Sequence, residues 1–114
     1  MKTTALLVLG VLLTGSLGTA AAAGDIAAGK EKSALCVSCH GADGNSTDPQ
    51  FPRLAGQHAN YLERALMDYR SGARKNPIMA GFAGGLKDED IANLAAYFSS
   101  QTGVVTPTQS RKIQ

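Results

Sequence analysis

The stretch Cys36-Val37-Ser38-Cys39-His40 decides the fold of this 114-residue chain. Two cysteines separated by two residues and followed at once by a histidine form the attachment motif for c-type haem. The two thiols can add to the two vinyl groups of one haem, and the adjacent His40 can reach the iron from the proximal side. The chain has two cysteines and two histidines, and three of these four residues lie in the motif. The motif therefore predicts one haem c, covalently attached through Cys36 and Cys39.

Two other chemistries use the same residue types. Cys-x-x-Cys is also the redox motif of thioredoxin-like proteins, but it occurs there beside a strand-rich βαβ pattern, which this sequence lacks. A structural zinc ion needs four Cys or His ligands, and the remaining candidate is the distant His58. Haem attachment is the interpretation that the sequence favours.

The first 23 residues are predicted to be a cleavable secretory signal peptide. Lys2 supplies a basic start, the run from Thr3 to Gly24 is uncharged, and Ala21-Ala22-Ala23 forms an A-x-A cleavage site. A retained membrane anchor is the alternative, because the uncharged run is long enough to span a bilayer. Export agrees with the haem motif, since c-type haem is attached outside the cytoplasm. We expect a haem domain over residues 24–102 and a flexible tail over residues 103–114.

The charge and composition of the exported part restrict its partners and its core. Loss of Lys2 leaves ten basic against nine acidic side chains, and no stretch interleaves Lys or Arg with aromatic residues. Binding to nucleic acid therefore has no support. Three Phe, three Tyr and no Trp make a thin core, which a buried haem would complete.

The hydrophobic pattern predicts an all-α fold. Asp25 is an expected N-cap for a first helix over residues 26–35, and a second helix over residues 59–71 should end at Gly72. A last helix should begin at residue 87 or 88. Between the last two, residues 73–85 are expected to be irregular, because they contain Pro77 and three glycines.

The sixth ligand of the iron is predicted to be Met79. Met1 leaves with the signal peptide, and Met67 lies about 140° around its helix from Leu62, which faces the core. Met79 instead lies in the expected irregular segment, where a thioether can approach iron without being tied to a helix face. His58 is an alternative ligand, which would make a bis-histidine haem.

The proximal histidine also needs a partner for its second ring nitrogen. Pro52 lacks an N–H but keeps its carbonyl, so its oxygen is the candidate acceptor for His40. Three basic residues are candidates to hold the haem propionates or to steer a redox partner: Arg53, Arg74 and Lys75. Val37 and Ala42, with the segment around Met79, could form an apolar rim at the haem edge.

These motifs resemble the class I cytochromes c, small soluble periplasmic proteins, and are most similar to one half of the dihaem bacterial cytochromes and to their monohaem relatives. The resemblance covers roughly residues 24–101. Its pieces are Gly29, the haem motif with Gly41, and the segments 51–57, 77–79, 86–91 and 94–98.

The resemblance implies an all-α fold around one haem, with His40 as proximal ligand, Met79 as distal ligand and Pro52 as the acceptor for His40. It also implies that Gly29 packs against Leu94 and Tyr97. Two positions depart from the family. Ser33 stands where an aromatic residue is common, and Lys87 replaces a Ser or Thr N-cap, which should weaken the last helix by about 1 kcal/mol.

The sequence therefore predicts a periplasmic one-electron carrier rather than an enzyme, with no small-molecule substrate. Its partners are expected to be redox proteins met transiently, such as membrane oxidoreductases, dehydrogenases or terminal oxidases. Two rivals remain open. One is a haem enzyme that binds a gas or peroxide after losing Met79, and the other is a cytochrome subunit fixed to a dehydrogenase or oxidase.

Overall fold

The computed structural model describes residues 23–103, and within this range the regular structure is entirely helical. Five α-helices and one 3₁₀ turn follow in the order α1 (Ile26–Lys32), the turn (Ser33–Leu35), α2 (Val37–His40), α3 (Ala59–Ser71), α4 (Pro77–Ala83) and α5 (Asp88–Ser100). The expected all-α class is confirmed. The predicted signal peptide and tail lie outside the described residues, apart from Ala23 and Gly103. In residues 23–103, no helix is long and apolar enough to cross a bilayer.

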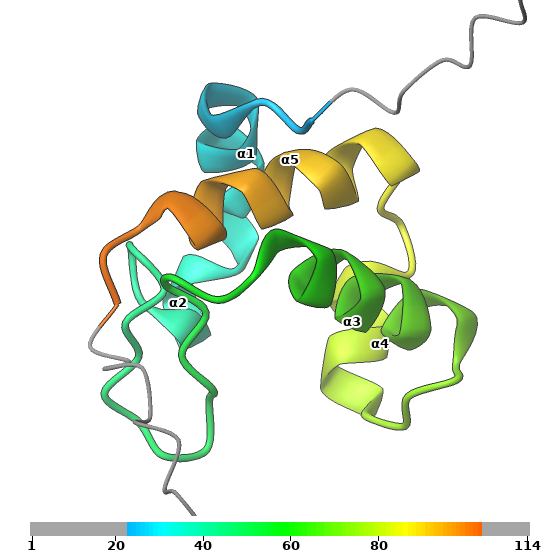
Figure 1. Cartoon of the computed structure of the whole chain (residues 1–114). Helices are drawn as coiled ribbons and strands as arrows, with labels where there is room; N and C mark the ends of the chain where they lie inside the picture. The colour runs from blue at the N-terminus through cyan, green and yellow to red at the C-terminus, as the bar shows by residue number, and fades with distance from the viewer. Residues whose placement is uncertain (1–22, 104–114) are drawn as a thin grey trace, which may run out of the picture.

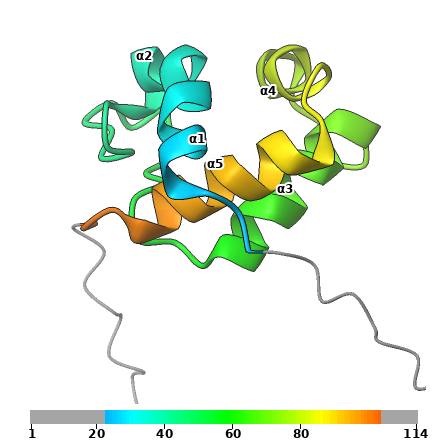
Figure 2. The ribbon, with the colours of Figure 1, turned by 90° about the horizontal axis from the view of Figure 1, so that it is seen from above.

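Helix α5 is the centre of the arrangement. Helix α1 crosses it on one side, α3 packs along it, and α4 packs against α3 (Figure 1). Seen from above, α2 and α4 stand on opposite sides of the space over α3 and α5 (Figure 2). The core is a cluster of five buried side chains: Leu62, Leu94, Ala95, Tyr97 and Phe98.

The crossing of α1 and α5 depends on a residue without a side chain. A Cβ atom at Gly29 would lie 2.8 Å from Cβ of Tyr97 and would collide with the backbone of Asn93. Asn93 also ties the start of α1 to α5, because its side-chain oxygen accepts a 2.7 Å hydrogen bond from the Asp25 N–H. The expected contact of Gly29 with Tyr97 is present, and the carbonyl of Asn93, rather than Leu94, is its nearest neighbour.

Helix α1 is shorter than the sequence predicted. The expected helix over residues 26–35 ends as α-helix at Lys32, and Ser33–Leu35 form a 3₁₀ turn. Ser33 is buried at this change, where its hydroxyl donates a 2.7 Å bond to the Lys30 carbonyl. At this position, where the resemblance described above makes an aromatic ring common, the chain has a small polar side chain whose hydrogen bond is satisfied by its own helix.

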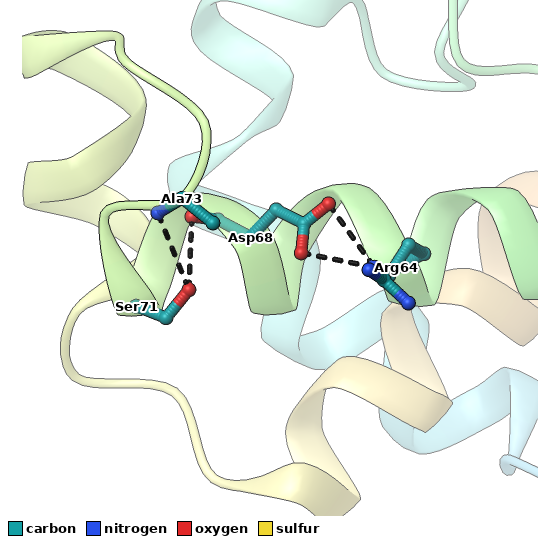
Figure 3. Close-up of polar contacts among 4 residues, drawn as sticks. All are labelled: Arg64, Asp68, Ser71 and Ala73. Atoms are coloured by element: carbon teal, nitrogen blue, oxygen red, sulfur yellow. Dashed lines mark hydrogen bonds and ion pairs between the residues drawn. The ribbon is translucent and has the colours of Figure 1, made fainter.

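Helix α3 has the predicted bounds. Gly72 follows it in the left-handed conformation (φ 80°), which a residue without Cβ adopts at low cost. Figure 3 shows the exposed side of its last turns, where Arg64 pairs with Asp68 at 2.9 Å. The Ser71 hydroxyl donates to the Asp68 carbonyl and accepts from the Ala73 N–H, which closes the helix end.

The expectation of an irregular segment over residues 73–85 is wrong, because Pro77–Ala83 form α4. Asn76 caps this helix, and its side-chain oxygen accepts from the N–H groups of Ile78 and Met79. Pro77 occupies the first helical position, where its missing N–H costs nothing and its φ suits the helix. An internal glycine, Gly81, weakens such a helix by only about 1 kcal/mol.

Helix α5 begins as expected, with Lys87 at the N-cap. A lysine side chain has no acceptor and cannot cap the helix N–H groups. Asp90 compensates in part, since its carboxylate accepts a 2.9 Å hydrogen bond from the Lys87 N–H and forms a 2.9 Å ion pair with Lys32. Asp90, the third residue of α5, therefore holds the N-terminus of this helix and also connects it to Lys32 of α1.

Candidate functional site

A large cavity is lined by residues of α2, α3, α4 and α5. It contains about 1150 Å³ of empty space, open solvent at its mouth included. Its floor is apolar and is formed by side chains of α3 and α5: Leu62, Ala65, Leu66, Leu94, Ala95 and Phe98. All five site residues predicted from the sequence line it: Cys36, Cys39, His40, Pro52 and Met79.

The two cysteines of the motif lie half-buried at the α2 side of the cavity, without a disulfide between them. Burial raises the pKa of the Cys36 thiol, and the neighbouring Cys39 raises it further. A reactive redox cysteine needs the opposite, a pKa lowered by nearby positive charge or a helix N-terminus. The thioredoxin-like alternative therefore gains no support from the surroundings of Cys36.

His40 is buried, and one of its ring nitrogens is engaged by the loop that follows. Nδ1 lies 2.8 Å from the carbonyl oxygen of Pro52. A carbonyl can only accept, so Nδ1 carries the proton and Nε2 keeps its lone pair. The acceptor proposed from the sequence is thus within hydrogen-bond distance of the proximal histidine candidate, in the arrangement typical of metal-bound imidazoles.

Met79 lies in α4, on the side of the cavity opposite α2. Its placement on a helix corrects the expectation of an irregular segment, yet its thioether still lines the cavity. The competing residues lie elsewhere: Met67 is 37% exposed, and His58 is exposed at the start of α3. Neither of them is among the residues that line the cavity.

The loop that carries Pro52 is held against α5. The Tyr97 hydroxyl donates a 2.8 Å bond to the Ala42 carbonyl, and the Gly56 N–H donates a 3.0 Å bond to the Phe98 carbonyl. These contacts fasten both ends of the loop to the central helix. The carbonyl of Pro52 is positioned by packing of the loop and not by His40 alone.

The structure distinguishes between the three basic residues that are candidates to hold the haem propionates or to steer a redox partner. Arg74 lines the cavity, whereas Arg53 and Lys75 do not. Sequence reasoning missed five further polar residues of the lining: Gln50, Gln57, Tyr61, Tyr69 and Asn76. The periodicity of α3 could have indicated the two tyrosines, because Tyr61, Ala65 and Tyr69 follow at intervals of four residues.

The residues around the cavity fit a haem. The lining is mostly apolar with a few polar groups, as is usual for cofactor sites. It has two thiols at one side, an imidazole with a bare nitrogen, and a soft thioether opposite, which are the donors that c-type haem uses. In residues 23–103, no cluster of three or more His, Cys, Asp or Glu side chains could hold a metal ion, so the zinc alternative finds no site there.

Comparisons with known proteins agree with this chemistry. Residues 26–102 match the cytochrome c family. Cytochrome c4 of Pseudomonas aeruginosa is 51% identical over 96 residues, which are 83% of this chain and 48% of that protein. Cytochrome c-554(548) of Halomonas halodenitrificans is 52% identical over 82 residues, which are 69% of this chain and 99% of that protein.

A solved structure shows the same fold. The crystal structure of reduced recombinant cytochrome c4 from Pseudomonas stutzeri has a TM-score of 0.68 and 47% identity, covering 71% of this chain and 47% of that one. The chain spans about half the length of the cytochrome c4 relatives, as expected for a resemblance to one half of longer cytochromes. Members of the family carry covalent haem c, which Cys36 and Cys39 fit. The matches cover most of the described residues, and the chain belongs to the cytochrome c family.

Proposed function

We propose that this protein is a periplasmic one-electron carrier with a single haem c. Cys36 and Cys39 form the thioether bonds, His40 is the proximal ligand through Nε2, and Met79 is the distal ligand. When bound, the haem supplies an iron that alternates between Fe(III) and Fe(II). The residues of this chain hold it, determine its ligands and keep water from it.

The observation that carries the proposal is the 2.8 Å contact between Nδ1 of His40 and the Pro52 carbonyl. It leaves Nε2 as the one ring nitrogen with a lone pair, on a side chain that lines the same cavity as Met79. A hydrogen bond to Nδ1–H also makes the imidazole a stronger donor to a metal.

The ligand pair argues for transfer of electrons rather than binding of substrate. With His40 and Met79 both on the iron, no position is open for a gas or peroxide. A thioether favours Fe(II) and so raises the reduction potential relative to a second imidazole. His58 is exposed and lies outside the lining of the cavity, so it does not supply a distal catalytic group there.

Features of the sequence and of the cavity rim support the proposed location and partners. The basic start, apolar centre and A-x-A end of residues 1–23 support export by a cleaved signal. An exposed apolar rim at the cavity, formed by Leu35, Ile78 and Phe82, suits small and transient contacts with membrane oxidoreductases, dehydrogenases or terminal oxidases.

Visible spectra of the purified protein test the proposal. The pyridine haemochrome should show one c-type haem per chain, and the haem should stay with the polypeptide in acid and organic solvent. The reduced protein should resist carbon monoxide, because Met79 closes the sixth position. Rapid binding of carbon monoxide by the intact protein would instead favour the gas-binding enzyme, and a haem that extracts freely would contradict thioether attachment.

A further inference from the structure

One residue of the cavity has a charge that the proposed ligands do not use. Among the described residues that line the cavity, Arg74 is the one with a permanent charge. Its guanidinium lies over the ring of Tyr69, 4.9 Å from the ring centre, and Nη1 donates a long, 3.4 Å hydrogen bond to the Tyr61 hydroxyl. Both tyrosines also line the cavity. The cavity lining thus has one cation, an exposed arginine that is held by one aromatic ring and one phenol hydroxyl.

The backbone of Arg74 is anchored as well. Its N–H donates a 3.0 Å bond to the Asp68 carbonyl, just beyond the left-handed Gly72 that ends α3. Ser71 closes the same turn by bonding to Asp68 and Ala73 (Figure 3). The guanidinium therefore starts from a backbone that the end of α3 holds in position.

The other arginines of the described chain are engaged elsewhere. Arg64 pairs with Asp68, Arg70 pairs with Asp88, and Arg53 donates to the Ser46 carbonyl. The two carboxylate oxygens of Asp68 both face Arg64, so the acid nearest Arg74 in sequence already has a partner. None of the three ion pairs in residues 23–103 includes Arg74.

The three polar residues line the same cavity as the two cysteines. A second hollow, which also includes Cys36 and Met79, is lined mainly by apolar side chains, including Leu35, Leu66, Phe82 and Leu86, and does not include Tyr61, Tyr69 or Arg74. In haem, the two propionates project from the half of the ring opposite the two vinyl groups. A haem attached at Cys36 and Cys39 would direct its carboxylates away from the cysteines, and Arg74 is the one permanent cation among the described residues of the cavity lining that could meet them. A guanidinium matches a carboxylate with two parallel N–H groups.

We propose that Arg74, seated on Tyr69 and joined to Tyr61, binds a haem propionate and so positions the haem between His40 and Met79. This inference rests on the proposed function, since it needs the haem. The hydrogen bond with Tyr61 raises the pKa of the Arg74 guanidinium above its usual value, so the group stays charged. A fixed cation beside the haem disfavours Fe(III), and Arg74 should therefore raise the reduction potential.

The test compares Arg74→Gln with Lys75→Gln in the haem-loaded protein. Lys75 is adjacent, is exposed as Arg74 is, carries the same charge and does not line the cavity. Arg74→Gln should lower the midpoint potential clearly, whereas Lys75→Gln should move it little. Redox-difference infrared spectra, with haem labelled isotopically in its propionate carboxyls, should show shifted carboxylate bands in Arg74→Gln alone.

Two further variants test the proposal if Arg74→Gln folds poorly. Arg74→Lys keeps the charge but loses the paired N–H groups, so it should retain most of the potential while the carboxylate bands shift. Tyr61→Phe should shift the bands less. Carboxylate bands that stay unchanged in Arg74→Lys, or equal effects of Arg74→Gln and Lys75→Gln, would overturn the role of Arg74. The haemochrome and ligand spectra of the parent report separately on the proposed function.

Discussion

The phenol hydroxyl of Tyr97 in α5 donates a 2.8 Å hydrogen bond to the carbonyl oxygen of Ala42, two residues after His40. The Cβ of the same tyrosine lies against Gly29 of α1. One side chain of the central helix thus contacts both the first helix and the loop that follows the haem motif. Substitutions that disturb the contacts of Tyr97 should therefore lower the stability of the fold before they change the ligands of the iron.

Gly29→Ala should destabilise the protein by about 3 kcal/mol, because the new methyl group meets the backbone of Asn93 and Cβ of Tyr97. Gly81→Ala is the matched control. Gly81 lies inside α4 with nothing within 4 Å of an added Cβ, so alanine there should stabilise the protein by about 0.5–1 kcal/mol. Denaturant unfolding of both variants measures the difference. Equal effects at the two positions would show that the helix crossing does not require a glycine.

Met79→Ala should remove the weak red absorption band of methionine bound to Fe(III). Met67→Ala should keep it, because Met67 is exposed and lies outside the lining of the cavity. Loss of the thioether should lower the midpoint potential by on the order of 0.1 V, since axial ligands control haem potentials over a wide range. The reduced Met79→Ala protein should also bind carbon monoxide.

A haem bound by two histidines, His40 and His58, predicts the opposite result for these variants. A low-spin spectrum that survives in Met79→Ala and disappears in His58→Ala would replace the His40–Met79 pair with two histidines. The same spectra therefore compare both ligation schemes directly.

The polypeptide should not fold without its haem. Cys36→Ala combined with Cys39→Ala leaves the cavity without its cofactor, about 1150 Å³ of largely apolar space including the mouth. The core that remains is too thin to offset the conformational entropy of the chain. Circular dichroism should show little helix and no cooperative melting. Near-native helicity with a sharp transition would mean that the haem is not part of the core.

Acid should weaken the junction of α1 and α5 through Asp90. The hydrogen bond from the Lys87 N–H, and next the interaction with Lys32, lower the pKa of the Asp90 carboxyl below its usual value. Its contribution to stability is therefore complete above the unfolded pKa of about 3.9 and is lost as pH falls through the lower folded value.

Unfolding midpoints measured from neutral to acid pH test this dependence. Asp90→Asn should lower stability at neutral pH and show a smaller loss in acid than the parent. Glu89→Gln removes the same charge from the same turn and should keep the acid dependence of the parent. An unchanged profile in Asp90→Asn would contradict the role of Asp90.

The parts of the fold that the sequence predicted are those with strong local signals. Leu62 and Leu66 at helical spacing, with Gly72 after them, were enough to give the bounds of α3. The segment around Met79 was misjudged, because Pro77 was counted as a helix breaker. After a capping Asn76, proline at the first position of a helix is favourable. The pair Asn76-Pro77 is a signal for the start of a helix. The three glycines that follow it nevertheless favoured an irregular segment in the prediction from sequence.

The site was predictable where covalent chemistry restricts the residues. Cys36, Cys39 and His40 must be adjacent in the chain, so the sequence displays them together. Pro52 could be selected because its carbonyl is an acceptor that follows the motif. The polar lining could not, since Tyr61, Tyr69 and Arg74 meet only when α3 and the turn after it are folded.

The pairing of α1 with α5 also has a consequence for how the protein is made. The two helices lie at opposite ends of the described chain, and a bond between their residues, Asp25 N–H to Asn93, closes a long loop. In an exported chain that has not yet folded, Cys36 and Cys39 lie inside this open loop. Such long-range contacts form late and slowly. We therefore expect the two thiols to be accessible for haem attachment before the last helix closes the fold.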